Sequence, residues 1–232
     1  MDKQTQKNLL DLVKRNYEEI AGGFSRTRTN RSWPELVKLT EPVKAGSRIF
    51  DVGCGNGRLL EILTGENIEY LGVDNSQELI KIAQARFPEK NFLNSNILEL
   101  NKISQKDFDY VFCIAVLHHL PGKALRIEAL EQLKTKLKPD GKIIITVWNL
   151  WGQAKFRKLI LKFVILKILG KNKMDFGDIL FAWKNNLGER LSQRYYHAFT
   201  KNEIKSLSER AGLKLEKLYK DSYNYYAILS KK

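Results

Sequence analysis

The sequence predicts an α/β fold in which helices cover both faces of a mostly parallel β-sheet. Short apolar runs alternate with helical segments from residue 47 to residue 148, which is typical of right-handed crossovers between parallel strands. Three glycines follow the first apolar run, where a strand would turn into a helix. The last two apolar segments are joined only by residues 220–222. Because that connection is too short for a crossover, we expect an antiparallel end to the sheet.

Residues 1–46 are expected to form a helical cap and an arginine-rich segment. Apolar residues at helical spacing predict a helix over Leu9–Ile20, and Gly22 and Gly23 should end it. Three arginines then fall within six residues. Pro34 suits the first turn of a second helix.

The sheet is expected to form over residues 47–148 and to be completed by residues 201–232, all within one domain of 1–232. Runs rich in Ile, Val, Leu and Phe predict the strands, and amphipathic segments predict the helices between them. Strands are expected at 48–52, 70–74, 91–96, 108–116, 142–148, 213–219 and 223–230, and helices at 58–63, 78–86, 124–137 and 202–211.

Residues 149–200 interrupt the alternation of strands and helices and are interpreted as a helical insertion after the fifth strand. They contain a basic helix at 153–169, a polar stretch, and the aromatic and basic run RLSQRYYHAF. Lys155, Lys158 and Lys162 would lie on one face of that helix. In an open α/β sheet such an insertion covers the carboxyl ends of the strands, where ligands bind.

The composition excludes several classes of protein. Hydrophobic residues make up 43% of the 232 residues, which argues against a disordered chain. The two cysteines, Cys54 and Cys113, cannot form a secreted disulfide framework, and no Cys/His cluster suggests a metal site. The first residues do not resemble a signal peptide, and 159–169 is too short to span a bilayer, so we expect a cytoplasmic protein without stable membrane insertion. The net charge of +14 favours contact with nucleic acid or an anionic membrane surface.

The segment IFDVGCGNGRLL, residues 49–60, carries the sharpest local signal. Its glycine spacing is G-x-G-x-G, because Arg58 stands where a dinucleotide-binding turn would need a third glycine. Asp51 beside this turn would repel a pyrophosphate but suits a ligand with an ammonium and a sulfonium, such as S-adenosylmethionine. Asp74, at the end of the second strand, can accept both hydroxyls of a ribose.

These motifs resemble the class I S-adenosylmethionine-dependent methyltransferases. The resemblance runs over about 48–148 and the last two strands. It implies a Rossmann-like, seven-stranded sheet with an antiparallel last strand, with Asn96–Ile97 beside the adenine. Many members have Asp where this chain has Asn96. The residues expected to contact the cofactor are Asp51, Gly53, Gly55, Asn56, Gly57, Asp74, Asn75, Asn96, Ile97 and Ala115.

The flanking segments resemble the tRNA wobble-uridine carboxymethyl methyltransferases, including the methyltransferase domain of the AlkB-homologue tRNA enzymes. The matching segments are 16–36, VLHHL at 116–120, ITVW at 145–148 and RYYHAF at 194–199. The resemblance implies esterification of the carboxylate of 5-carboxymethyluridine, or a related carboxylate, in the anticodon loop of tRNA. It also implies tRNA as a partner and, for the eukaryotic members, a small zinc-binding activator subunit.

In the light of this resemblance, arginine is the natural clamp for a carboxylate. We expect Arg26, Arg28 and Arg194 to hold the substrate carboxylate and His118 to donate a hydrogen bond at the reacting centre. Because neighbouring strand residues point opposite ways, only one of His118 and His119 should face the substrate. The residues expected to contact the substrate base or close the site are Tyr17, Phe24, His119, Trp148, Tyr195, Tyr196 and His197.

Two other functions remain open from the sequence. One is methylation of a small molecule, such as a quinone or lipid precursor, with the same cofactor turn. The other is a cofactor-binding activator or RNA-binding module without catalysis. The basic helix at 153–169 has three interpretations: a lid with a solvated face, a contact to the tRNA backbone, or a helix lying on a membrane surface.

Overall fold

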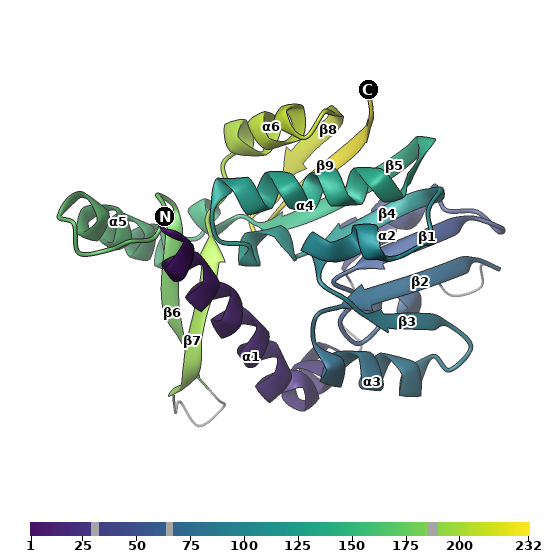
Figure 1. The fold of residues 1–232 in the computed structure, drawn as a ribbon, viewed down its shortest axis with the longest axis horizontal. Helices are drawn as coiled ribbons and strands as arrows, with labels where there is room; N and C mark the ends of the chain where they lie inside the picture. The colour runs from purple at the N-terminus through teal and green to yellow at the C-terminus, as the bar shows by residue number, and fades with distance from the viewer. Residues whose placement is uncertain (29–32, 64–66, 185–189) are drawn as a thin grey trace.

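The computed structural model describes residues 1–28, 33–63, 67–184 and 190–232, with the side chains of 20, 22–28, 183–184 and 190–191 excepted. Its main feature is a seven-stranded sheet in the order β3-β2-β1-β4-β5-β9-β8 (Figure 1). Strands β1 to β5 pair in parallel, and β9 runs antiparallel to both β5 and β8. This confirms the expected sheet with an antiparallel last strand. The strands are β1 Arg48–Val52, β2 Glu69–Asp74, β3 Asn91–Asn94, β4 Phe108–Ile114, β5 Leu137–Trp148, β8 Leu213–Lys220 and β9 Asn224–Lys231.

Helices pack on both faces of this sheet because the strands are apolar on both sides. In β1, Ile49 belongs to one hydrophobic layer, and Phe50 belongs to the other. The Ile49 layer is covered by α2 (Pro34–Thr40) and α3 (Gln77–Arg86), and the Phe50 layer by α4 (Lys123–Lys136) and α6 (Lys201–Arg210). The helix expected over 58–63 is only a short 3₁₀ turn, η1 (Arg58–Glu61).

The first helix, α1 (Lys3–Arg28), lies across the front of the molecule between α3 and β7 (Figure 1). It continues through Gly22 and Gly23, so the end predicted there was wrong. A glycine inside a helix costs about 1 kcal/mol, which the packing of a long helix can offset.

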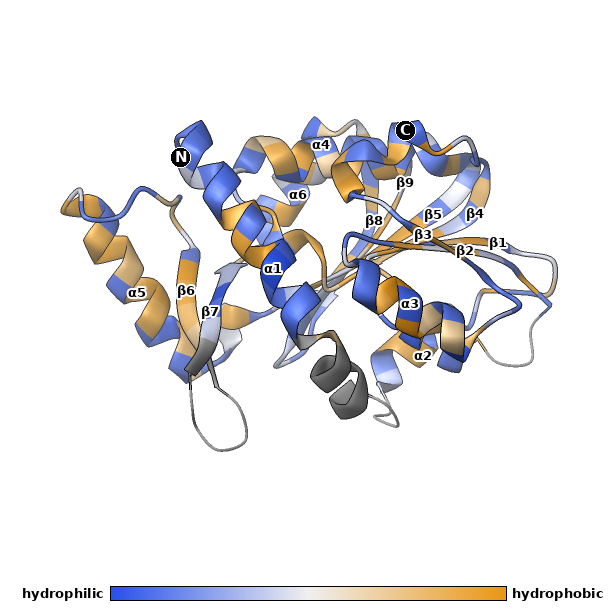
Figure 2. Cartoon of the chain, turned by 60° about the horizontal axis from the view of Figure 1, so that its bottom comes forward, coloured by the Kyte–Doolittle hydropathy of each residue, from blue (hydrophilic) through white to orange (hydrophobic). Residues whose placement is uncertain are grey.

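The described part of the insertion contains a 3₁₀ turn, η4 (Leu150–Gly152), the helix α5 (Ala154–Ile168), and a separate two-stranded antiparallel sheet of β6 (Asp178–Lys184) and β7 (Arg190–His197). The helix was expected, but the hairpin was not. Tyr195 packs with Leu9 of α1, whereas Tyr196 packs with Phe156 and Ile160 of α5. Because both faces of the hairpin are buried, its sequence lacks the alternation that usually indicates a strand. Figure 2 shows hydrophobic residues over most of α5.

Within the described ranges, none of the helices is long and apolar enough to cross a membrane.

Candidate functional site

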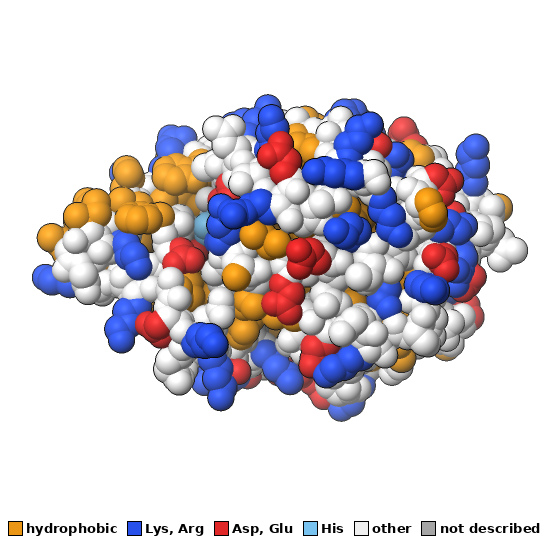
Figure 3. Space-filling view, turned by 45° about the horizontal axis from the view of Figure 1, so that its top comes forward, with side chains coloured by type: hydrophobic (Ala, Val, Ile, Leu, Met, Phe, Trp, Pro, Cys, Tyr) orange, Lys and Arg blue, Asp and Glu red, His pale blue; other side chains and the backbone are white. Residues whose placement is uncertain are grey.

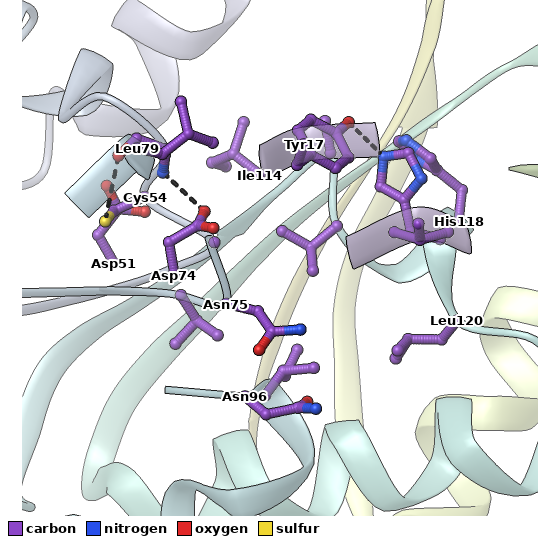
Figure 4. A pocket seen from close by; sticks show the side chains of 18 of the residues that line it. Tyr17, Asp51, Cys54, Asp74, Asn75, Leu79, Asn96, Ile114, His118 and Leu120 are labelled. Atoms are coloured by element: carbon purple, nitrogen blue, oxygen red, sulfur yellow. Dashed lines mark hydrogen bonds between the residues drawn. The ribbon is translucent and has the colours of Figure 1, made fainter. Parts of the chain in front are cut away.

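A cavity of about 610 Å³ lies at the carboxyl ends of β1, β2, β4 and β5, where ligands bind in open α/β sheets. Helix α1 contributes one wall of it, and Tyr196 of β7 contributes another. Figure 4 shows Asp51 and Asp74 toward one end of the cavity, and Tyr17 and His118 toward the other. The insertion therefore reaches the sheet edge where the sequence placed it.

The glycine turn after β1 is held in a conformation that other residues rarely adopt. The φ angles of Gly53, Gly55 and Gly57 are 77°, 56° and 77°. A Cβ atom added to Gly53 would lie 2.2 Å from Cγ2 of Val116. The turn therefore requires glycine at position 53 both for its backbone angle and for the space beside Val116.

Asp51 is the most perturbed carboxyl group in the cavity. It is 2% exposed, and its Oδ2 accepts a hydrogen bond of 2.8 Å from the Tyr70 hydroxyl. Burial raises the pKa of Asp51 to about 7. None of the ion pairs found between described residues involves Asp51. A ligand ammonium group would supply the missing positive charge, so this site fits the methionine end of S-adenosylmethionine.

Asp74 lies at the end of the neighbouring strand. It accepts hydrogen bonds of 2.9 Å from the backbone amides of Gly55 and Ser76. Burial raises its pKa above the usual value. Asn75 and Asn96 extend the same side of the cavity beyond Asp74 (Figure 4). This row of acceptors fits a ribose followed by an adenine edge.

Ala115, at the end of β4, carries a backbone strain that the sequence did not reveal. Its φ is 59°, a left-handed conformation that costs an L-residue about 1–2 kcal/mol. Its amide donates to the Thr146 hydroxyl oxygen at 3.0 Å, which helps to hold this geometry. Strained residues of this kind cluster at ligand sites, and Ala115 and Ile97 both line the cavity.

His118 and His119 both line the cavity. They were expected to point opposite ways as strand neighbours, but β4 ends at Ile114 and they lie in the 3₁₀ turn η3 (Leu117–His119). The Tyr17 hydroxyl lies 2.8 Å from Nε2 of His119. The Trp148 amide donates a long hydrogen bond of 3.4 Å to Nδ1 of His118. An acceptor role for Nδ1 leaves the proton of neutral His118 on Nε2, as a donor requires.

Trp148 and Tyr196 form an aromatic wall beside these histidines. Their rings stack with centroids 4.7 Å apart at 16°, and the Tyr196 ring also contacts the rings of Phe181, His118 and His119. Tyr196 is 3% exposed. The two rings therefore already stack on each other, and a substrate base would meet the edge of this wall.

The structure does not place Tyr195 and His197 among the residues that line the cavity. They lie on the opposite face of β7 from Tyr196, because strand neighbours alternate. The Tyr195 hydroxyl donates to Asp178 at 2.8 Å, and His197 bridges Asp178 at 2.7 Å and Glu203 at 2.8 Å. These contacts tie the hairpin to α6.

The three arginines of the expected clamp are placed unequally. The side chains of Arg26 and Arg28 lie outside the described residues. Arg194 is half-buried on the Tyr196 face of β7, next to the cavity but not in its lining. The clamp therefore stays a prediction.

Two groups of polar or aromatic residues are among the cavity residues that sequence reasoning did not select. Asp11 and Lys14 line the cavity from α1 together with Tyr17. The spacing of three residues between each of these and the next could have indicated neighbouring positions on the helix surface. Arg58 lines it with Trp33, whose ring lies 5.6 Å from the guanidinium carbon. In the sequence, Arg58 served only to exclude a dinucleotide-binding turn, which would have glycine at that position.

Several contacts hold α1 over the cavity. The Glu18 carboxylate accepts hydrogen bonds from the amides of Gln77 and Glu78, at 3.0 and 3.4 Å, at the start of α3. The Asn16 side chain donates to the Gln193 carbonyl of β7 at 2.5 Å. An acidic group at a helix N-terminus is favourable, so Glu18 joins the cap to the cofactor end of the site.

Comparison with known proteins agrees with this geometry. Residues 50–143 match a family model described as a methyltransferase domain. The chain is 33% identical over 159 residues to the mouse tRNA (carboxymethyluridine(34)-5-O)-methyltransferase ALKBH8, which covers 67% of this chain but only 23% of that protein. It is 29% identical to the Schizosaccharomyces pombe protein called tRNA (carboxymethyluridine(34)-5-O)-methyltransferase, over 95% of this chain and 96% of that one.

Solved structures share the fold. A Methanosarcina mazei S-adenosylmethionine-dependent methyltransferase matches with a TM-score of 0.69 and 20% identity, over 86% of this chain and 98% of that one. A Haloferax volcanii putative methyltransferase, in complex with the Trm112 methyltransferase activator, matches with a TM-score of 0.65 and 16% identity, over 94% and 96%.

Proposed function

Because the chain belongs to the S-adenosylmethionine-dependent methyltransferases, we propose that it methylates the carboxylate of a modified wobble uridine in tRNA. The acceptor is 5-carboxymethyluridine or a related carboxylate, and the product is a methyl ester. The observation that carries this proposal is the similarity to the fission yeast enzyme along nearly the whole of both chains. The animal relatives are longer, and the chain spans 23% of the mouse protein. The proposed activity is cytoplasmic.

In this proposal, residues at one end of the cavity bind the cofactor, and residues at the other end bind the substrate. The cofactor supplies an electrophilic methyl group on its sulfonium. Asp51 offers a carboxylate to the ammonium group, and Asp74 offers acceptors to the ribose hydroxyls. The turn around Gly53 brings the backbone close to the ligand without a side chain between them.

The substrate carboxylate needs no general base. An ordinary carboxylic acid has a pKa of about 4 and is already an anion at neutral pH. The wall formed by η3, β5 and β7 accordingly offers His118, His119, Trp148 and Tyr196 but no carboxylate. Positioning of the anion in line with the methyl group can supply much of the rate enhancement. We propose Arg194, with Arg26 and Arg28, as the groups that hold the anion.

The proposal is tested by methyl transfer from labelled S-adenosylmethionine to tRNA from cells that lack wobble esters, followed by mild alkali. A carboxyl ester should release the label as methanol. Label that survives alkali would place the methyl group on nitrogen, carbon or ribose and refute esterification. The assay is run with the chain alone and with an activator of the Trm112 kind, which we propose as a partner because the Haloferax volcanii protein of similar fold is bound to one.

The arginine clamp is tested separately from cofactor binding. Arg194→Ala should abolish transfer to tRNA while calorimetry shows unchanged binding of S-adenosylmethionine. Arg194→Lys should restore little, because an ammonium cannot match a carboxylate with two parallel hydrogen bonds. Lys214→Ala, an exposed basic residue on β8 far along the sheet, is the matched control. Transfer that survives Arg194→Ala would remove Arg194 from the clamp.

A further inference from the structure

The outer face of α5 exposes large apolar side chains. The exposed fractions are 55% for Leu161, 57% for Ile165, 71% for Ile168 and 59% for Leu169. Ile165 and Ile168 lie four and seven residues after Leu161 and so share one face of the helix, and Leu169 follows them as the C-cap residue. Phe156 and Ile160 on the opposite face are buried. The exposed residues thus form a stripe that the rest of the described chain does not cover.

This stripe lies in the most basic part of the insertion. Residues 151–174 contain seven cations and no acidic residue. Lys155, Lys158 and Lys162 are exposed and border the stripe on α5. The cations of the segment are Lys155, Arg157, Lys158, Lys162, Lys167, Lys171 and Lys173.

The position of α5 leaves this face open to a large partner. Figure 1 shows α5 at the end of the molecule farthest from strands β1 to β3, beyond the β6–β7 hairpin. Figure 3 shows hydrophobic side chains gathered at that end, with Lys and Arg side chains around them. No residue of α5 lines the cavity. A partner on α5 would therefore bind to residues that do not line the cavity.

The combination of apolar and basic side chains on α5 indicates which kind of partner could bind there. A second copy of the chain would bring two segments of seven cations each into contact, and like charges repel. An RNA backbone would pair with the lysines, but Leu and Ile side chains do not stack on bases. An anionic lipid surface satisfies both features, because its headgroups attract Lys and Arg while its interface receives apolar side chains.

We infer that α5 is a peripheral docking helix for an anionic lipid surface, with the stripe Leu161, Ile165, Ile168 and Leu169 entering the headgroup boundary. The lysines beside the stripe extend to the phosphates with their alkyl stems along the apolar surface. The C-terminal half of α5 enters deeper, because the stripe lies there and the N-terminal half carries Arg157 and Lys158 on the same side. Docking of this kind needs no membrane-spanning segment.

The test is flotation of the full chain with vesicles of phosphatidylcholine and with vesicles of equal parts phosphatidylcholine and phosphatidylglycerol. Wild-type protein should float only with the anionic vesicles, and less so as salt rises. Ile165→Gln/Ile168→Gln should lower the partition at least about tenfold, because two apolar side chains no longer leave water. Lys158→Gln/Lys162→Gln should also lower it.

Matched controls separate this surface from general properties of the chain. Val37→Gln alters an apolar residue that is 44% exposed on α2, and Lys201→Gln/Lys205→Gln removes two exposed charges from α6. Both controls should float like the wild type. Thermal unfolding and calorimetry with S-adenosylmethionine should be unchanged in every variant, which shows that the fold and the cofactor site are intact.

Three results would overturn the inference. The first is wild-type protein that stays unbound with anionic vesicles. The second is binding that Ile165→Gln/Ile168→Gln leaves unchanged, which would reduce the effect to charge alone. The third is wild-type protein that does not bind vesicles but whose tRNA affinity or dimerisation is lost in Ile165→Gln/Ile168→Gln. That result would assign the stripe to RNA or to a second copy of the chain.

Discussion

The glycine turn of the cofactor site gives the sharpest prediction for the fold and the site together. In Gly53→Ala the new Cβ atom meets Cγ2 of Val116 at 2.2 Å, and the backbone is held at a φ of 77°. The backbone angle alone costs about 1–2 kcal/mol. The clash adds about 1–3 kcal/mol, which is the usual cost of overpacking. We therefore expect Gly53→Ala to lower the free energy of unfolding by about 2–5 kcal/mol.

Gly46→Ala separates the two contributions. Gly46 has a φ of 80°, but nothing lies within 4 Å of an added Cβ atom. This variant should show only the cost of the backbone angle, about 1–2 kcal/mol, which lowers the Tm by about 2–8 °C in a chain of this size. Gly46 precedes β1 and lies outside the cavity lining, so binding of S-adenosylmethionine should not change.

Val116→Ala removes the atom that causes the clash. In the double variant Gly53→Ala/Val116→Ala we expect recovery of about 1–3 kcal/mol relative to the sum of the single changes. Urea unfolding of the four proteins in a double-mutant cycle measures this coupling, and calorimetry measures cofactor affinity. Equal destabilisation by Gly53→Ala and Gly46→Ala, or additive effects in the cycle, would refute the account of the turn.

The remaining predictions concern charge and hydrogen bonds around the site. Burial raises the pKa of Asp51 to about 7 from a usual 3.8. The protonated carboxyl therefore stabilises the cofactor-free protein fully below about pH 4, and this stabilisation is lost as pH rises to about 7. In urea unfolding, Asp51→Asn should abolish this dependence of stability on pH, and the variant should bind S-adenosylmethionine more weakly. Asp140→Asn, a change on the exposed surface, should have neither effect. Tyr17→Phe removes the hydroxyl beside His119 and should lower kcat/KM about tenfold with cofactor affinity retained; an unchanged kcat/KM would argue against a positioning role. His197→Gln removes one of the two groups that Asp178 and Glu203 share, while Arg126 stays 3.9 Å and 3.7 Å from them. The loss of these hydrogen bonds to charged groups should cost about 1.5–3 kcal/mol in urea unfolding. Burial lowers the pKa of His197, but hydrogen bonds to its two carboxylate partners raise it more, so the net shift is upward. The free energy of unfolding of the wild type should therefore fall as pH rises from 6.5 through the raised pKa. If His197→Gln shows the same dependence on pH, this reasoning is wrong.

The core of the fold could be predicted because its signals are local. The glycines after Val52, the acidic residue at the end of β2, and the short connection before β9 each depend on a few neighbouring residues. Strand boundaries shifted by a few residues, as when β4 ended at Ile114 rather than at 116. His118 and His119 lie beyond that strand end in a 3₁₀ turn, so the alternation of strand neighbours does not apply to them and both can face the cavity.

The parts that could not be predicted depend on contacts between distant segments. The β6–β7 hairpin is buried by α1 on one face and by α5 on the other, so its residues do not alternate. For the same reason the sequence could not assign Tyr195 to Asp178 and Tyr196 to the cavity wall. The left-handed backbone of Ala115 is held by a hydrogen bond to the neighbouring strand β5 and leaves no trace in composition or spacing.

The central claim is best tested with two tRNA preparations of the same sequence, one with 5-carboxymethyluridine at the wobble position and one with unmodified uridine there. Both are incubated with methyl-labelled S-adenosylmethionine and the full chain, with and without an activator of the Trm112 kind, and the wobble nucleoside is analysed by mass spectrometry. The account predicts a labelled methyl ester only in the carboxymethyl tRNA. Equal label in both preparations, or label at any other nucleoside, would contradict it.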